Sequence, residues 1–581
     1  MPADELASIL LSWSVSLRGS ISDNHAGLLK SLGLIQEGKL KVTADPTEFN
    51  GREAIPEAIN YSYEKKTIDK LAVGLVAALA QVAVVAAVML AVYCVGDASA
   101  TWMPHIVSKG NKFFNSVTGE EFRLKGIAYY PRPNAGKLYK VDNYDWTADE
   151  HEAVWRPHLE VMKDLGVNTI RLYSVDPSKS HDKFMCACSE AGIYVLVGMS
   201  APCAKCAVID ALPPACYPSE LFARAQLVYN AFAVYDNTLG FSVGNENNLQ
   251  KVAGNKDGTA TAPCVKAFLR DVRSYASSCA TNLRTVPIGL DIADIPPRGT
   301  WIQYYDCSVD DDEHTRAEWI GFNPYVECEP KTHAKYVRSD GLRGLMKEYE
   351  QVGYSRPLMF GEFGCNLGEN TVNGFENQRQ FYDAKWMNEE KEMTAQIVGG
   401  NVFEFTTEFV HLEKESTVPL EHSKKRDSGK FGIGYFEPDN CDHVKANCTF
   451  TPYPEYANLK AAYTTTANSS VKMASFSPKN TKILKCPKTI ATKLPPTPVV
   501  NYLKCSVRQP VCDGAKANAF EKDASLMVPI GTKKKPSNAA DRTKKKVVQD
   551  VVTSAAPRAL SRSAAACTVF ASLAVALWLA A

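Results

Sequence analysis

The chain has almost no net charge. Its 65 lysine and arginine residues are balanced by 64 aspartate and glutamate residues, which leaves a formal charge of +1. Proteins that bind nucleic acid through its phosphates usually carry a basic excess, and none is present here. We therefore expect no nucleic-acid partner.

The sequence also lacks the signatures of cofactor sites. No glycine-rich phosphate-binding loop follows the first strand-like segment of the central region, at 123–130. Cys203 and Cys206 have the spacing of half a zinc or redox site, but no second cysteine pair or histidine cluster completes it, which favours disulfides. We expect no metal ion and no other cofactor.

Cysteine, in contrast, is abundant, with 17 residues. Most of them lie between Cys186 and Cys512, and this density indicates an oxidising compartment and disulfide bonds. Cys94 and Cys567 lie in hydrophobic segments and need not pair. The remaining number is odd, so at least one cysteine is free, intermolecular or lost in processing.

The N-terminal part contains one long hydrophobic segment. Residues 1–64 carry no recognisable motif, and residues 65–100 contain the apolar run Leu71–Val95 followed by an A-x-A-like cleavage signal. This region is predicted to be a signal peptide or a signal-anchor, with a buried core helix as the third alternative. No methionine lies between Met1 and Met89, so residues 1–64 are either a gene-model artefact or a cytoplasmic extension.

Residues 101–465 alternate between short strand-like runs and helical stretches such as 150–166, 181–192 and 219–235. This alternation predicts an α/β fold, a disulfide-stabilised (β/α)8 TIM barrel, with a flavodoxin-like doubly wound sheet as the alternative. The segments predicted to be strands are 123–130, 168–175, 193–200, 239–246, 285–292, 319–325, 357–363 and 398–405.

The C-terminal part changes composition again. Residues 466–556 are rich in lysine, threonine and proline and are predicted to be a disordered linker. Its runs Lys533–Lys535 and Lys544–Lys546 are interpreted as solvated charge, or alternatively as a polybasic membrane patch.

Residues 557–581 have the order of a GPI-attachment signal. Small residues beginning at Ser554 precede a polar spacer and the apolar tail Ala564–Ala581. A tail-anchored helix is the alternative. Asn447 and Asn468 begin N-x-S/T acceptor motifs for glycosylation, which only a secreted topology would use.

Two carboxylates carry the functional argument. Glu246 ends the run LGFSVGNE, and Glu362 lies in MFGEFG, each at the end of an apolar strand-like segment. In a parallel barrel the carboxyl ends of the strands hold the catalytic groups. Two carboxyl groups facing one sugar are what retaining glycosidic chemistry requires. Glu404 and Glu408, near the last predicted strand, are candidates for further site carboxylates or for structural roles.

Five segments in order resemble the fungal-type β-1,3-glucanosyltransferases of glycoside hydrolase family 72, which are GPI-anchored cell-wall remodelling enzymes. They are KGIAYYP (125–131), NTIRLYSVDP (168–177), YDNTLGFSVGNE (235–246), GFNPYVEC (321–328) and MFGEFGCN (359–366). The resemblance implies that Glu246 is the general acid/base and Glu362 the nucleophile. It also implies a set of substrate-binding positions: Tyr129, Arg171, Tyr173, Asn245 and Tyr325.

Each of these positions has a specific implied role. Asn245 would bond the sugar 2-hydroxyl, Arg171 and Tyr173 would orient carboxylate and sugar, and Tyr325 would donate to the nucleophile. Tyr129 would be a subsite aromatic, although a core position for any of the tyrosines is the alternative. The resemblance further implies disulfide relations: Cys328 with Cys365, Cys307 with Cys441 or Cys448, and Cys186 or Cys188 near Cys216.

The sequence departs from the family pattern at two places. Gly198-Met199 stands where the family usually has Asp-Leu, which puts one donor-side contact in doubt. Phe403 and Phe405 stand where the family has tyrosines, so stacking on sugars is expected there without hydrogen bonds.

Taken together, the sequence predicts a retaining enzyme that cleaves and elongates β-1,3-glucan chains, with donor and acceptor glucans as its partners. The alternatives are an endo-β-glucanase on the same barrel and a non-catalytic wall-binding protein. The predicted location is the outer face of the cell membrane through a GPI anchor, or the cell wall.

Overall fold

The computed structural model describes residues 41–44, 47–50, 103–135, 144–252, 254, 257–326, 334–364, 379–407, 431–505, 510 and 512. The chain forms two compact units, one from residues 1–99 with 538–581 and the other from residues 100–537. In the first unit, β1 (Lys41–Ala44) pairs antiparallel with β2 (Thr47–Asn50). The second unit holds the other described elements.

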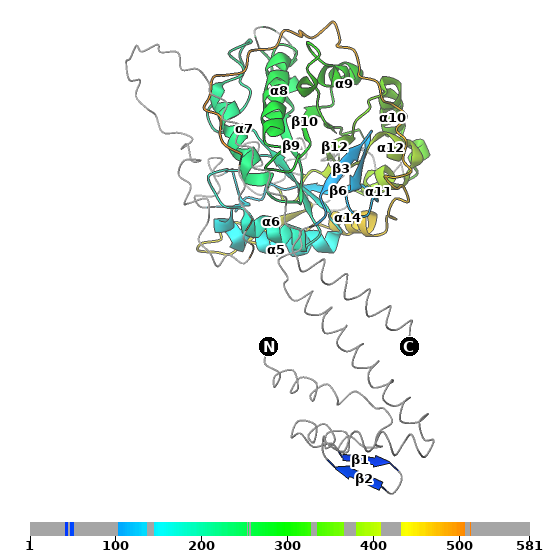
Figure 1. The fold of residues 1–581 in the computed structure, drawn as a ribbon. Coiled ribbons are helices and arrows are strands. Elements are labelled where there is room, and N and C mark those ends of the chain that lie inside the picture. The colour runs from blue at the N-terminus through cyan, green and yellow to red at the C-terminus, as the bar shows by residue number, and fades with distance from the viewer. Residues whose placement is uncertain are drawn as a thin grey trace. The chain divides into compact units, whose positions relative to one another are not determined.

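Eight parallel strands of the second unit close into a barrel, which confirms the predicted fold and excludes the doubly wound alternative (Figure 1). The strands follow chain order around the barrel, and the last pairs with the first. Each overlaps a predicted segment: β6 (Leu124–Ala128), β7 (Thr169–Leu172), β8 (Tyr194–Gly198), β9 (Thr238–Asn245), β10 (Ile288–Ala293), β11 (Ile320–Asn323), β12 (Leu358–Phe363) and β13 (Gly399–Val402).

Helices pack around the outside of the barrel (Figure 1). In the first of them, Trp155, Leu159 and Met162 recur at helical spacing and are buried, and Gly166 ends the helix at a φ of 78°. The helices are α5 (Glu152–Leu165), α6 (Asp182–Glu190), α7 (Ser219–Phe232), α8 (Ala262–Ser278), α9 (Arg298–Asp306), α10 (Asp340–Val352), α11 (Tyr382–Glu389), α12 (Lys391–Gln396) and α14 (Glu455–Thr464).

Shorter elements occupy the connections. A pair of antiparallel strands, β14 (Gly434–Glu437) and β15 (Thr449–Pro452), follows the barrel. Short 3₁₀ helices lie in loops: η4 (Asp149–His151), η5 (Asn247–Leu249), η6 (Glu313–Thr315) and η7 (Tyr336–Arg338).

A small antiparallel sheet precedes the barrel, formed by β3 (Ile106–Lys109), β4 (Lys112–Asn115) and β5 (Glu121–Phe122). Its side chains Ile106 and Phe113 share a buried cluster with residues at or near the starts of barrel strands: Leu124, Tyr194, Leu196, Leu239, Trp319, Met359 and Val398. The sheet therefore covers the amino-terminal mouth, which leaves the carboxyl-terminal mouth for a functional site.

The segment after α14 was expected to be a disordered linker over 466–556, and for residues 466–505 this expectation is wrong. We call these residues the strap. Its Leu484 N–H donates to Asp306 Oδ2 at 2.8 Å, and its Leu503 N–H donates to Gln226 Oε1 at 2.9 Å. The prediction failed because the strap is held by backbone hydrogen bonds and cysteines rather than by a continuous hydrophobic face.

Disulfides fasten this region to the barrel. The pairs within the described residues are Cys186–Cys512, Cys203–Cys206, Cys216–Cys264, Cys279–Cys505, Cys307–Cys486 and Cys441–Cys448. The expected pairings of Cys307 and of Cys186 are wrong, because the strap brings the late cysteines back along the helices. Cys203 and Cys206 form a disulfide, as the sequence favoured, and Cys188 is a buried free thiol.

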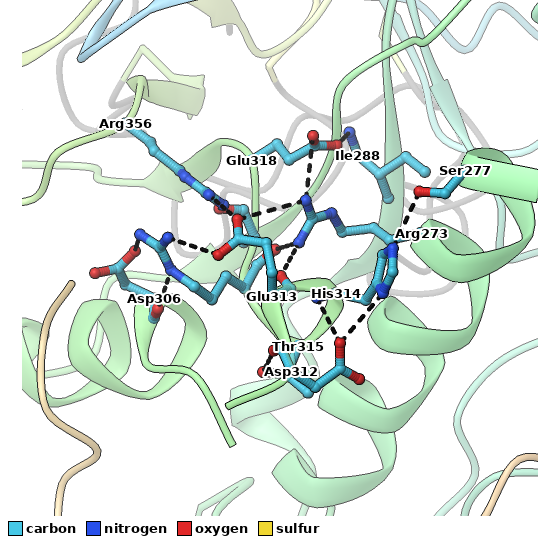
Figure 2. Close-up of polar contacts among 12 residues, drawn as sticks. Arg273, Ser277, Ile288, Asp306, Asp312, Glu313, His314, Thr315, Glu318 and Arg356 are labelled. Carbon is cyan, nitrogen blue, oxygen red and sulfur yellow. Dashed lines mark hydrogen bonds and ion pairs between the residues drawn. The ribbon is translucent and has the colours of Figure 1, made fainter. Parts of the chain in front are cut away.

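A polar network fixes the loop between α9 and β11 against α8 (Figure 2). Arg273, on α8, lies 3.3 Å from Glu318 and donates to the backbone oxygen of Arg316 at 2.7 Å. Arg316 in turn pairs with Asp306 at 2.7 Å. Because Asp306 also accepts the N–H of Leu484, the network joins two helices, the loop and the strap.

We expect the strap disulfides to contribute strongly to stability. Replacing Cys279 and Cys505 together by alanine opens a link between residues 226 positions apart, and should lower the free energy of unfolding by about 3 kcal/mol. The same change at Cys203 and Cys206, three positions apart, should cost roughly half as much. Denaturant titration without reductant measures both losses, and equal losses would contradict the expectation.

Several expectations fall outside the described residues and stay predictions. They are the signal peptide or anchor within 65–100, the GPI signal at 557–581 with Ser554, Glu408 and the Cys328–Cys365 disulfide. Among the residues that are described, no helix has the length and apolar character needed to cross a membrane. The acceptors Asn447 and Asn468 are both exposed.

Candidate active site

The two carboxyl groups selected from the sequence lie at the carboxyl ends of barrel strands. Glu362 belongs to β12, and Glu246 directly follows β9. Glu246 has a φ of 52°, and its N–H donates to Asp291 O, on β10, at 3.0 Å. This left-handed turn ends the strand and begins η5.

Three donors converge on the carboxylate of Glu362, which is 6% exposed. Arg171 Nη1 donates to Oε1 at 2.8 Å and the Tyr173 hydroxyl donates to Oε1 at 2.6 Å. The Tyr325 hydroxyl donates to Oε2 at 2.8 Å. Burial, and then the charge of Glu362, raises the pKa of Tyr325 well above its ordinary value, so this hydroxyl remains a donor.

Glu246 has a different environment, although the two carboxyl groups interact. Burial and next the charge of Glu362 raise the pKa of Glu246, while one hydrogen bond from Asn323 opposes this. That bond runs from Asn323 Nδ2 to Glu246 Oε1 at 2.8 Å. A carboxyl group whose pKa is raised in this way is suited to act as a general acid.

Arg171, on β7, connects the parts of the site. Its Nη2 donates to Asn245 Oδ1 at 2.7 Å and lies 3.2 Å from Asp291 Oδ2. Burial alone would lower the pKa of Arg171, but Asp291, Tyr173 and Glu362 raise it. The guanidinium is therefore a permanent cation that holds Asn245 and Glu362 in fixed positions.

Aromatic rings lie beside the nucleophile. The ring of Phe403 makes edge contacts with Tyr173 at 6.3 Å and with Phe431 at 5.4 Å, and Phe431 lies 5.6 Å from Tyr325. Phe403 is thus at the site, where stacking on a sugar was expected. Phe405 is not, because it is fully buried against Phe450 at 4.6 Å.

The expected role of Tyr129 as a subsite aromatic is wrong. Its side chain is 1% exposed, and its hydroxyl bonds His158 Nδ1 at 2.8 Å in the layer between barrel and helices. The next residue, Tyr130, is partly exposed, and its ring lies 6.4 Å from that of Tyr173. Since successive side chains of a strand point to opposite faces, a shift of one residue accounts for the error.

The sequence prediction missed two polar residues of the site, Asp291 on β10 and Asn323 at the end of β11. Asp291 carries the signal by which Glu246 and Glu362 were found, a carboxylate in an apolar strand, whereas Asn323 has no carboxylate and was not marked by that signal. For Glu404 the sequence left open a role in the site or a structural role. Its side chain is buried, with the residue 2% exposed, and its backbone N–H donates to Phe431 O at 2.8 Å.

The departure at Gly198 has a structural reason. A Cβ built on Gly198 would lie 1.9 Å from the backbone oxygen of Tyr173, so no side chain fits this backbone.

Over the described parts of the chain, no group of three or more His, Cys, Asp or Glu residues is arranged to hold a metal ion. The expectation that the protein needs no cofactor stays a prediction.

The fold and the site together define a class of protein. A parallel barrel presents at its carboxyl rim one carboxylate held by three donors and one carboxyl group with a raised pKa. This division of roles, with one carboxyl group suited to donate a proton and the other held as the anion, is that of a glycoside hydrolase-type site.

Residues 96–427 match the model of the glucanosyltransferase family, glycoside hydrolase family 72, and the chain belongs to this family. Over 304 residues it is 33% identical to the 1,3-beta-glucanosyltransferase gel1 of Aspergillus fumigatus, covering 52% of this chain and 59% of that protein. Over 307 residues it is 33% identical to 1,3-beta-glucanosyltransferase GAS5 of Saccharomyces cerevisiae, covering 52% and 56%. The chain thus matches less than two thirds of the length of these relatives.

A solved structure shows the same architecture. The Saccharomyces cerevisiae protein Gas2p, in complex with laminaripentaose, superposes with a TM-score of 0.52 at 28% sequence identity. The match covers 68% of this chain and 78% of the Gas2p chain.

Proposed function

We propose that this protein is a β-1,3-glucanosyltransferase that cleaves and rejoins β-1,3-glucan chains by double displacement. The observation that carries the proposal is the unequal environment of the two carboxyl groups, with three donors on Glu362 and a raised pKa at Glu246. The names of the gel1 and GAS5 relatives, and the laminaripentaose bound to Gas2p, support the substrate class.

In the first step, Glu362 attacks the anomeric carbon and Glu246 protonates the departing glycosidic oxygen. Oε1 of Glu362 accepts from Arg171 and Tyr173, whereas Oε2 accepts from Tyr325 alone among the described residues. We assign the attack to Oε2, because it has the freer lone pair. Asn245 accepts from Arg171 through Oδ1, which leaves its amide nitrogen to donate to a sugar hydroxyl.

In the second step, Glu246 takes a proton from the attacking hydroxyl group, which displaces Glu362 and restores the free enzyme. If the hydroxyl belongs to a second glucan chain, the product is an elongated chain. If it belongs to water, the glycosyl-enzyme is hydrolysed and a shortened chain is released. The aromatic rings of Phe403 and Phe431 beside the nucleophile support the retention of sugar over water.

The test is the size of the products. The full chain, produced in a secretory host, is incubated with a laminari-oligosaccharide labelled at its reducing end. We expect products both shorter and longer than the donor from the wild type, and neither from a variant with Glu246→Gln and Glu362→Gln. Shorter products alone would make the protein an endo-β-glucanase, and no products from folded protein would favour a wall-binding role.

Activity should fall at alkaline pH as Glu246 loses its proton. Because burial and the charge of Glu362 raise its pKa above the ordinary 4.5, Glu246 stays protonated to higher pH, and activity is lost only as the pH rises through the raised value. Asn323→Ala removes a donor that favours the anion, and should move the alkaline limb of kcat/KM to higher pH. Asn111→Ala, in the amino-terminal sheet, is the control, and a shift of the limb to lower pH would contradict the assignment.

We propose that the enzyme works outside the cell, held at the membrane by a GPI anchor near Ser554. Disulfides distributed over the barrel and the strap support an oxidising compartment. The order of small residues, spacer and apolar tail at 554–581 supports the anchor. Release of the protein from intact cells by a phosphatidylinositol-specific phospholipase tests this, and retention after treatment would favour a tail-anchored helix.

A further inference from the structure

A third carboxyl group, that of Asp291, lies inside the barrel next to the catalytic pair and takes no part in the double displacement. It is 1% exposed. Its Oδ2 accepts from Ser242 Oγ at 2.7 Å and lies 3.2 Å from Arg171 Nη2. Its Oδ1 is buried and has no hydrogen-bond partner among the described residues. A buried carboxylate oxygen without a donor is costly and needs an explanation.

The orientation of Asn323 supplies half of that explanation. Arg171 can only donate, so the atom of Asn245 that faces it must be the oxygen Oδ1. Asn323 approaches the same oxygen at 3.3 Å and must therefore present its nitrogen Nδ2 there, as it also does to Glu246. The amide oxygen of Asn323 is left on the opposite side, facing into the barrel.

That oxygen and Asp291 Oδ1 occupy the same small space. A Cβ built on Gly361 would lie 2.3 Å from Asp291 Oδ1 and 2.7 Å from Asn323 Oδ1. Asn323 Oδ1, like Asp291 Oδ1, is buried and without a partner in the described part of the chain. Two acceptor atoms without a partner therefore border the space that glycine leaves, and a proton on one of them would let it donate to the other.

The balance of charge favours a proton at this place. The double displacement needs Glu362 ionised and Glu246 protonated, and Arg171, the cation that contacts both Glu362 and Asp291 in the described part of the chain, then neutralises Glu362. An ionised Asp291 would leave a net negative charge in the buried site, whereas a protonated one leaves none. Burial first, and then the charge of Glu362, raises the pKa of Asp291, although Arg171 and Ser242 oppose this.

We propose that Asp291 is a positioning residue that carries a proton in the resting enzyme, with its Oδ1–H donating to Asn323 Oδ1 while its Oδ2 holds Arg171 and Ser242. In this arrangement one side chain fixes both the guanidinium that orients Glu362 and the amide that bonds Glu246. The groups that face it are Arg171 from β7, Ser242 from β9, Asn323 from β11 and Glu362 from β12, with Glu246 beyond Asn323.

The first test is independent of activity. An unfolded aspartate loses its proton near pH 3.9, so a folded state that keeps the proton makes the wild type less stable as the pH rises above 4. Asp291→Asn reproduces the shape and the donor of the neutral acid and does not titrate. Its melting temperature minus that of the wild type should therefore increase from pH 4 to 6, by roughly one to two degrees per pH unit.

The control is Asp439→Asn at an exposed position, whose difference from the wild type should stay flat over the same range. A flat or falling difference for Asp291→Asn would mean that Asp291 is ionised in the folded protein, and would overturn the proposal. Failure of Asp291→Asn to fold would also overturn it, because the amide retains every bond that the neutral acid is proposed to make.

The second test uses turnover and rests on the proposed function. Asp291→Asn should lose less than about 10-fold in kcat/KM, and both limbs of its pH profile should lie at the same pH as in the wild type. Asp291→Ala should lose about 100-fold. If Asp291 is instead ionised, its removal withdraws a negative charge and moves both limbs to lower pH, which overturns the proposal. A wild type without turnover would refute the proposed function alone, since the melting experiment still decides where the proton is.

Discussion

Glu362→Gln should lower the rate of glucan cleavage and transfer by at least about 10⁴-fold, because an amide cannot form the covalent glycosyl-enzyme intermediate. The change keeps the size of the side chain but leaves the buried Arg171 without its carboxylate, so the melting temperature should fall and the rate is measured on the folded fraction. Sizing of the products from a labelled laminari-oligosaccharide measures the rate. The exposed Glu220→Gln is the matched control and should retain full activity.

The role of Glu246 is separated from that of Glu362 by the choice of leaving group. Glu246→Gln should be nearly inactive on laminari-oligosaccharides, which need a proton on the departing oxygen, but should recover the first step on β-laminaribiosyl fluoride, which does not. Glu362→Gln should recover nothing with the fluoride. Recovery in the Glu362 variant and not in the Glu246 variant would exchange the two assignments.

The barrel was predictable because its strands are buried on both faces. Such strands appear in the sequence as short apolar runs between helical stretches, and β9 and β12 are clear examples. A polar residue at the end of such a run is conspicuous, which is why Glu246 and Glu362 were found. By the same signal Asp291 was available in β10, but one polar residue among several strands does not reveal which of its neighbours it will face.

The errors arose where function depends on the face of a strand or on contacts between distant segments. Tyr129 and Tyr130 differ by one position, and only the register of β6 in the closed barrel decides which of them reaches the site. The strap has the composition of a linker, yet it is ordered by partners such as Asp306 and Gln226 that lie far away in the sequence. No local pattern carries this information.

Arg171→Met should reduce both activity and stability, because Arg171 is the cation on which the site depends. It lies 2.8 Å from Glu362 and donates to Asn245 at 2.7 Å, with its side chain almost fully buried. Methionine fills the volume but leaves a buried carboxylate without its counter-ion. We expect a loss of about 3 kcal/mol in the free energy of unfolding and of roughly 10²–10³-fold in kcat/KM. Denaturant titration and initial rates on the folded fraction measure the two losses.

Two further variants show that these losses belong to the site. Arg284→Met removes a guanidinium that donates to the backbone of Thr238 at 2.6 Å, at the opposite end of β9 from Glu246, and should cost stability while kcat/KM of the folded protein is kept. Arg171→Lys keeps the charge, but an ammonium group lacks the planar fork that reaches Glu362, Asn245 and Asp291 at once, so its activity should lie between those of the wild type and Arg171→Met. Full activity in Arg171→Lys would mean that charge alone matters and that the geometry of the guanidinium does not.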